Sequence, residues 1–117
     1  MAVTLCTEAN AKLHAGANFS TALTSGNWET FINQAECEIN METKVNWIDA
    51  YSGINADTKL VLELATACLA ANFAIKYDMN TYFVNEARDL ININNYYYEK
   101  ALSKLKEFQF SDFVKSA

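Results

Sequence analysis

The sequence predicts an all-α protein, a bundle of about four main helices with a short N-terminal helix and an extended C-terminal tail. The chain has 117 residues, three glycines and no proline, so the two residue types that most disfavour helix interiors are scarce. Hydrophobic residues make up 51% of it, which suffices for a packed core and disfavours disorder. In several stretches they recur three or four positions apart, the spacing of one helical face. A chain of this length is expected to form one domain.

The first two helices are expected to start at polar residues. Residues 5–16 predict a short helix with Thr7 as its N-cap and Gly16 at its C-terminal end. Residues 17–26 are rich in Ser, Thr and Gly and predict a loop. A second helix is expected from about Asn27, because the apolar residues that follow keep helical spacing. Its buried face comprises Trp28, Phe31, Ile32, Ala35 and Ile39.

Polar residues lie between the apolar positions of this helix, and apolar residues keep helical spacing beyond it. Glu29, Gln34, Glu36 and Glu38 are expected to lie away from the core, with a solvated position preferred for Glu29 and Glu36. In the following METKVNWIDAYSG, residues 41–53, a threonine at position 43 is able to cap a new segment. The pattern therefore fits either one kinked helix or two helices, ended by the glycine at position 53.

The most apolar stretch, LVLELATACLAANFAIKYD at residues 60–78, predicts a third helix capped by Asn55 or Asp57. Apolar residues occupy nearly all of its faces, which is typical of a helix surrounded by other helices. We prefer a central core helix, with a contribution to a subunit interface as the alternative. A membrane span is disfavoured because Glu63 and Lys76 would place charges in the bilayer.

A fourth helix is expected over residues 82–107, with Asn80 or Thr81 as its cap. The triplet Tyr96–Tyr98 follows two asparagines, and only one basic residue is close to it. A subunit-contact or half-buried role is therefore preferred over base stacking. The buried face is expected to comprise Phe83, Ala87, Leu90, Ile91, Tyr98, Ala101, Leu102 and Leu105, with Asn94 as an interruption.

Three phenylalanines, Phe108, Phe110 and Phe113, follow the end of the helical pattern. A segment this short cannot bury three large aromatic rings by itself. They are expected either to fold back on the bundle or to dock on another subunit, with the fold-back slightly preferred.

The chain carries no recognisable catalytic chemistry. Its net charge of −5 disfavours binding to nucleic acid or to an acidic membrane surface, since both require clustered basic residues. Cys6, Cys37 and Cys68 do not form a disulfide framework or a zinc motif, and Cys37 and Cys68 are expected among apolar neighbours as free thiols. The one histidine, His14, is expected at a helix end or on the surface. We therefore expect no catalytic, cofactor-binding or metal site, and no enzyme activity.

Four segments follow one another in the order typical of a known family. They are FINQAECEINMET, NWIDAY, an alanine-rich helix ending in AIKYD and a long helix ending in ALSKLKE. The family pattern of two apolar residues, then Ala-Glu, Ile, Thr and an aromatic-containing turn corresponds here to Phe31, Ile32, Ala35, Glu36, Ile39, Thr43 and Trp47, followed by the alanine-rich helix from Ala65 to Tyr77. Residues 27–107 thus resemble the head–tail connector (adaptor, or head completion) proteins of tailed bacteriophages.

This resemblance implies a virion structural protein rather than an enzyme. Adaptor subunits of the family assemble into a ring, usually dodecameric, beneath the portal protein. The ring extends the DNA channel and joins the capsid to stopper or tail proteins. Double-stranded DNA would pass without specific binding, which suits an acidic chain. The expected location is the neck of the virion, at the head–tail interface, after synthesis in the host cytoplasm, and no membrane partner or cofactor is expected.

The resemblance divides the chain into a helical-bundle adaptor domain, residues 1–107, and a C-terminal docking tail, residues 108–117. In such adaptors the C-terminal segment reaches into the portal, so the tail phenylalanines become expected anchors there. The alternative function is a small helical regulatory or protein-interaction module that binds a partner helix through its aromatic face. The residues expected to contact the portal or a neighbouring subunit are Phe108, Phe110, Phe113, Tyr96 and Tyr97.

Overall fold

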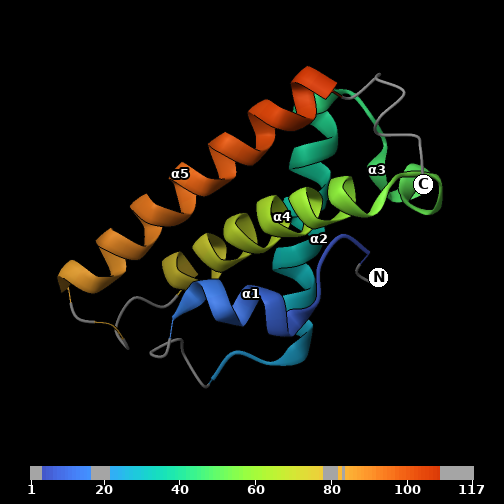
Figure 1. Cartoon of the computed structure of the whole chain (residues 1–117). Helices are drawn as coiled ribbons and strands as arrows, with labels where there is room; N and C mark the ends of the chain where they lie inside the picture. Colours follow the sequence, from blue (N-terminus) through green and yellow to red (C-terminus); the bar gives the residue numbers. More distant parts are fainter. Residues whose placement is uncertain (1–3, 17–21, 78–81, 83, 109–117) are drawn as a thin grey trace.

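The computed structural model describes residues 4–16, 22–77, 82 and 84–108, with the side chains of residues 84, 107 and 108 left out. All regular secondary structure in this part of the chain is helical, which confirms the all-α prediction (Figure 1). In chain order the elements are α1 (Glu8–Ala15), α2 (Ser25–Thr43), α3 (Trp47–Ala50), the 3-10 turn η1 (Tyr51–Gly53), α4 (Ala56–Tyr77) and α5 (Val84–Phe108).

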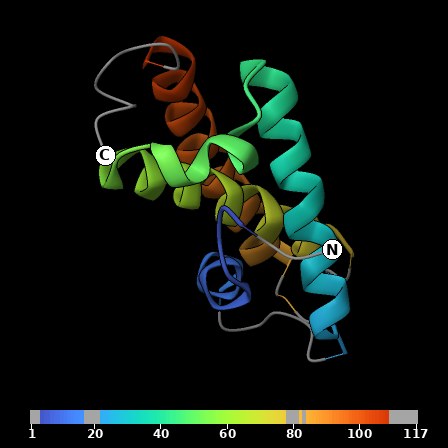
Figure 2. The ribbon, with the colours of Figure 1, turned by 90° about the vertical axis from the view of Figure 1, so that its right-hand side faces the viewer.

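Helix α4 lies in the middle of the bundle and packs against α1, α2 and α5. Figures 1 and 2 show α5 running beside α4 in the opposite direction, while α2 crosses α4 steeply. The central position of the apolar stretch is therefore confirmed. Alanine side chains allow the neighbouring helices to approach closely, because they add little bulk between backbones. The alanines at positions 65, 67, 70, 71 and 74 are each at most 2% exposed.

By length and composition α4 could also cross a membrane. However, 67% of its most apolar window is buried inside the fold. A core helix of a globular protein passes the same test, because it is also apolar on most faces. This burial favours the core interpretation of α4.

Both of the first two helices begin with a capping box. In α1 the Thr7 side chain accepts a hydrogen bond from the Asn10 backbone N–H at 3.2 Å, and the Asn10 side chain accepts one from the Thr7 N–H at 2.9 Å. This confirms Thr7 as the N-cap, and Gly16, at φ 83°, follows the helix as predicted. Thr24 and Asn27 form the same pair of hydrogen bonds at the start of α2. Helix α2 thus begins at Ser25, two residues before the predicted start.

Removal of the Thr24 cap should destabilise the protein by about 1 kcal/mol, because the Asn27 N–H would lose its partner at the helix end. The variant Thr24→Ala tests this in a urea titration followed by circular dichroism. Thr24→Ser keeps a hydroxyl at this position and is the matched control. A free energy of unfolding for Thr24→Ala equal to that of Thr24→Ser would contradict the role of the hydroxyl.

The segment after α2 forms two helices rather than one kinked helix. Helix α2 ends at Thr43, and Lys44 adopts a left-handed conformation with φ 59°. Asn46 then caps α3 by accepting a hydrogen bond from the Asp49 N–H. Thr43 was the predicted cap, but its hydroxyl instead donates to the Ile39 carbonyl at 2.8 Å and accepts from the Trp47 indole at 2.9 Å. The break is therefore built from local side-chain hydrogen bonds.

Glu36 lies in the core, so its predicted solvated position is wrong. Its side chain is 1% exposed, and one carboxylate oxygen accepts hydrogen bonds from the Thr4 and Leu5 amides at 2.8 and 2.7 Å. A buried carboxylate requires such donors, because water no longer solvates it. The hydrogen bonds attach the segment before α1 to α2.

The last two helices largely follow the predictions. Asn55, one of two expected caps, accepts a hydrogen bond from the Thr58 N–H at 2.8 Å at the start of α4. Helix α5 begins at Val84 rather than at Tyr82, whose hydroxyl instead donates to the Ala15 carbonyl at 2.6 Å. The alternative caps at positions 80 and 81, and Phe83, lie outside the described residues. Ala87, Tyr98, Ala101, Leu102 and Leu105 are buried as expected, and Leu90 and Ile91 are partly buried.

Asn94 does not interrupt the buried face of α5, contrary to the prediction. It is 2% exposed, and its side-chain amide donates to the His14 carbonyl at 2.9 Å. At the next residue of α5, the Asn95 side chain accepts a hydrogen bond from the Asn72 amide of α4 at 2.9 Å. These hydrogen bonds between α1, α4 and α5 fix the position of α5 along α4, since another register would leave buried polar groups unpaired.

Candidate interaction surface

The histidine and two of the three cysteines lie in or near the core. His14 lies in the last turn of α1, at the expected helix end, and is half-buried, with its Nδ1 atom 3.7 Å from Cys68 Sγ. Burial lowers the pKa of His14, and the nearby Glu63 opposes this effect. Within the described residues, no group of three or more His, Cys, Asp or Glu side chains is arranged to hold a metal ion.

The three cysteines are free thiols in two different environments. Cys6 and Cys68 are buried, and burial raises the pKa of Cys6 to about 12 and that of Cys68 to about 11. Glu36 adds to the shift at Cys6. Cys37 is exposed, so its predicted position among apolar neighbours is wrong. Cys37 lies between Glu36 and Glu38 in the sequence, and its side chain faces outward from α2.

We expect Cys37 to react with iodoacetamide well before Cys6 and Cys68 in the folded protein. The thiolate is the reactive form, and the two buried thiols are both inaccessible and strongly protonated at neutral pH. Mass spectrometry of a time course, with peptide mapping, measures the three rates. The same protein in urea is the control, in which all three cysteines should react at similar rates. Equal rates in the folded state would contradict this description of the core.

The surface of α5 differs on its two sides. One side carries Ile93, Tyr96 and Tyr97, which are 51%, 60% and 44% exposed. The third tyrosine of the triplet, Tyr98, faces the core, where burial raises its pKa to about 12. Tyr96 and Tyr97 are the predicted contact residues whose side chains the structure describes. The Phe108 side chain, Phe110 and Phe113 lie outside the described residues.

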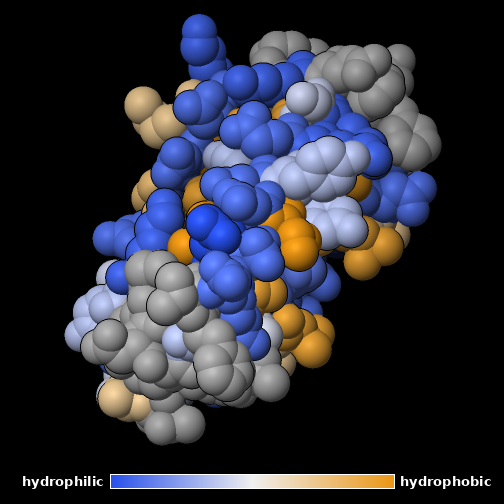
Figure 3. Space-filling model, turned by 90° about the vertical axis from the view of Figure 1, so that its left-hand side faces the viewer, coloured by the Kyte–Doolittle hydropathy of each residue, from blue (hydrophilic) through white to orange (hydrophobic). Residues whose placement is uncertain are grey.

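Single exposed apolar residues are common on protein surfaces. On the face in Figure 3, hydrophobic residues appear as separate patches within a mainly hydrophilic surface. Leu13 of α1 and Met41 of α2 are each 78% exposed. The tyrosines of α5 differ from these because they lie beside a hollow. Their rings also contact each other edge to face, with centroids 5.5 Å apart.

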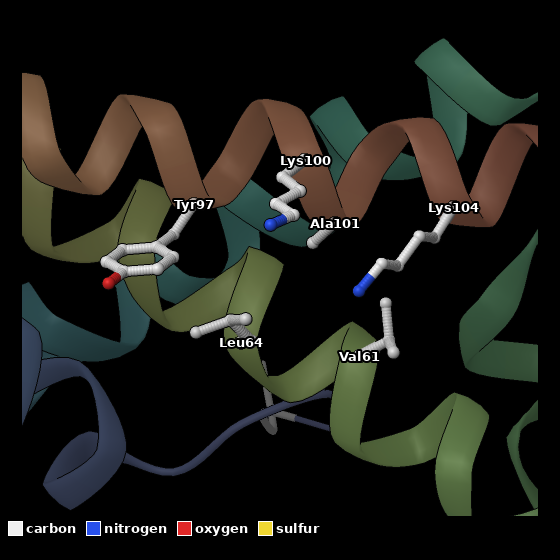
Figure 4. Close-up of a pocket in the computed structure, with 6 residues that line it drawn as sticks. All are labelled: Val61, Leu64, Tyr97, Lys100, Ala101 and Lys104. Atoms are coloured by element: carbon white, nitrogen blue, oxygen red, sulfur yellow. The ribbon is translucent and has the colours of Figure 1, made fainter.

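A hollow of about 190 Å³ lies between α4 and α5, and we call it the α4–α5 groove. Figure 4 shows its residues extending from both helices, with Tyr97 and two lysines of α5 above Val61 and Leu64 of α4. Leu60, 62% exposed, lies one helical turn before Leu64 on α4 and extends the apolar side. The groove is lined by Val61, Leu64, Tyr97, Lys100, Ala101 and Lys104.

The groove is locally basic on an acidic protein. Its lining includes Lys100 and Lys104 but no Asp or Glu, whereas the whole chain has a net charge of −5. The Lys100 ammonium lies 5.7 Å from the centre of the Tyr96 ring, a cation–π contact. An apolar floor beside two ammonium groups can accept an apolar side chain that is followed or preceded by a carboxylate.

The sequence pattern points to the tyrosines of α5 but carries no sign of the groove beside them. In the sequence, Lys100 and Lys104 lie near the end of the expected fourth helix, and Val61 and Leu64 lie within the apolar stretch expected to form the core helix. The groove forms because α4 and α5 are antiparallel, so that the start of one helix meets the end of the other. The available signal was the i, i+4 spacing of apolar residues on each helix, Leu60 with the partly buried Leu64 and Ile93 with Tyr97.

Comparison of the chain with protein-family models, with curated proteins and with solved structures finds no match.

Proposed function

We propose that this protein is a structural subunit that acts by assembling with other protein chains through the α4–α5 groove and the tyrosines beside it. The observation that carries the proposal is the row of exposed apolar residues, Ile93, Tyr96 and Tyr97, next to an apolar hollow. Tyrosine suits surfaces that are covered in an assembly, because its ring is apolar and its hydroxyl tolerates water. The helices behind the groove hold these side chains on a rigid support.

The resemblance of residues 27–107 to phage head–tail connectors supports a more specific assignment. In this proposal the chain is an adaptor in the neck of a tailed bacteriophage and forms a homo-oligomeric ring beneath the portal. The ring would continue the DNA channel used in genome packaging and present a platform to stopper or tail proteins. An acidic subunit is suited to this task, because it does not attract the phosphates of passing DNA. The proposed role requires no catalytic step.

A small helical regulatory or interaction module is the second candidate function. The same aromatic surface supports it, because a short groove on a helical bundle can receive one partner helix. The two candidates differ in stoichiometry. A discrete one-to-one complex with another protein, and no ring, would favour the module over the adaptor.

The double variant Tyr96→Ser/Tyr97→Ser tests the proposed surface. We expect its self-association or portal binding to weaken by roughly 30-fold or more, since truncated interface tyrosines often cost about 2 kcal/mol of binding free energy. Sedimentation velocity and native mass spectrometry, at high concentration with and without portal, measure the assembly. Its thermal stability should change little, because both side chains are exposed.

Leu13→Ser/Met41→Ser is the matched control, since it also removes two exposed apolar side chains. This control should assemble like the unmodified protein. Unchanged assembly of the tyrosine variant would reject the surface, and an unmodified protein that stays a monomer and never joins portal would reject the adaptor function.

A further inference from the structure

We infer that the α4–α5 groove of one copy binds the segment 109–113, Gln-Phe-Ser-Asp-Phe, of a neighbouring copy. The inference deepens the proposed function and rests on it, because it requires that copies of this chain assemble. It names the contact between subunits and the residues on each side. Phe110 and Phe113 would enter the apolar part of the groove, and Asp112 would pair with its lysines.

The size of the groove favours side chains over a small-molecule ligand. Its volume is about 190 Å³, below the roughly 300–1,000 Å³ typical of small-molecule sites. Its floor, Val61, Leu64 and Ala101, is apolar, and its polar groups are those of Tyr97 and the two lysines. A hollow of this kind fits one or two large apolar side chains of a peptide segment.

The charges of the groove and of the segment are complementary. Within the described residues, the ion pairs to lysine involve Lys12 and Lys106, and none involves Lys100 or Lys104. The segment contributes one carboxylate, Asp112, between two phenylalanines that are three residues apart. Opposite charges at the rim would set the orientation of the segment and favour this partner over others.

The geometry of α5 favours a segment from another copy over the chain's own segment. Val61 and Lys104 line one end of the groove and Leu64 and Tyr97 the other, so the groove runs from near the end of α5 back toward its middle (Figure 4). The chain's own segment would have to reverse direction directly after Phe108, where α5 ends.

Ser111 and Asp112 are the turn-forming residues available for such a reversal. Their use in a turn would remove the carboxylate from the groove and deliver only Phe113. A segment from a second copy can present both phenylalanines and the carboxylate together. The groove and the segment are different surfaces of the same chain, so their contact is head-to-tail. Contacts of this kind can close into rings.

A photo-cross-linking experiment on the full chain tests the inference. Phe113 is replaced by benzoyl-phenylalanine, and heavy and light isotope-labelled chains are co-refolded before illumination. We expect cross-links to peptides that contain Leu64 or Tyr97, with heavy–light pairs among them. Cross-links to the groove within single chains only, or cross-links elsewhere, would overturn the inference.

Charge reversal provides the second readout. Lys100→Glu/Lys104→Glu and Asp112→Lys should each weaken self-association roughly tenfold or more, and their combination should restore it, because the charges are again complementary. Lys76→Glu, which reverses an exposed lysine at the other end of α4, is the control and should leave assembly unchanged. Absence of rescue would overturn the inference.

The two experiments distinguish the inference from the proposed function. If the protein assembles and the tyrosine variant does not, but the segment fails to cross-link to the groove, the function stands and the segment is not the ligand. If the unmodified protein neither self-associates nor joins portal, both proposals fail.

Discussion

Replacing Glu36 with alanine is expected to lower the free energy of unfolding by roughly 2–4 kcal/mol, because two backbone amides, one of them buried, would lose a charged acceptor. The Thr4 and Leu5 amides lie 2.8 and 2.7 Å from the carboxylate, and the Leu5 hydrogen bond is buried. The truncation would also leave a cavity in the core. A urea titration followed by circular dichroism measures the loss. Hydrogen exchange at the Leu5 amide should accelerate in the same variant.

Two further variants separate the carboxylate from its surroundings. Glu38→Ala removes an exposed carboxylate from the same helix, and its effect should stay within about 0.5 kcal/mol. Glu36→Gln keeps an acceptor oxygen of similar shape but no charge, so its effect should lie between those of the two alanine variants. If Glu36→Ala and Glu38→Ala have equal free energies of unfolding, the Glu36 carboxylate does not hold the segment before α1.

The incorrect prediction for Glu36 shows that helical spacing can indicate burial even where the residue type argues against it. Position 36 lies four residues after Ile32 and three before Ile39, so the period of α2 alone places it on the buried face. The prediction gave more weight to the residue type, because carboxylates are rarely buried without partners. The partners are backbone amides about thirty residues earlier in the chain, and such amides have no signature in a sequence.

The groove was not predictable for a similar reason. Local signals gave the helix boundaries well, because a cap such as Thr7 or Asn55 acts within three residues of itself. The groove instead depends on the register of α4 against α5, whose lining residues are separated by more than thirty positions. Asn72, Asn94 and Asn95 fix that register through hydrogen bonds. Their side chains read as polar interruptions when the sequence is considered alone.

Replacing Trp47 with alanine is the second change with a large expected effect, a loss of about 3–5 kcal/mol in the free energy of unfolding. The indole is 1% exposed and donates to the Thr43 hydroxyl at 2.9 Å, and its backbone N–H donates to the Asn40 side chain at 3.0 Å. It thereby joins the end of α2 to the start of α3. Trp28 remains in the variant and reports unfolding by fluorescence.

Trp47→Phe separates packing from hydrogen bonding. It retains most of the buried apolar surface, so it should lose about 1–2 kcal/mol, the cost of leaving the Thr43 hydroxyl without the indole. Thr43→Val removes the other partner, and the double variant completes a thermodynamic cycle for the hydrogen bond. If Trp47→Ala cost no more than Trp47→Phe, the indole would not fill the core at this corner. The turn between α2 and α3 would then depend on Asn40 and Asn46, whose side chains hold its backbone amides.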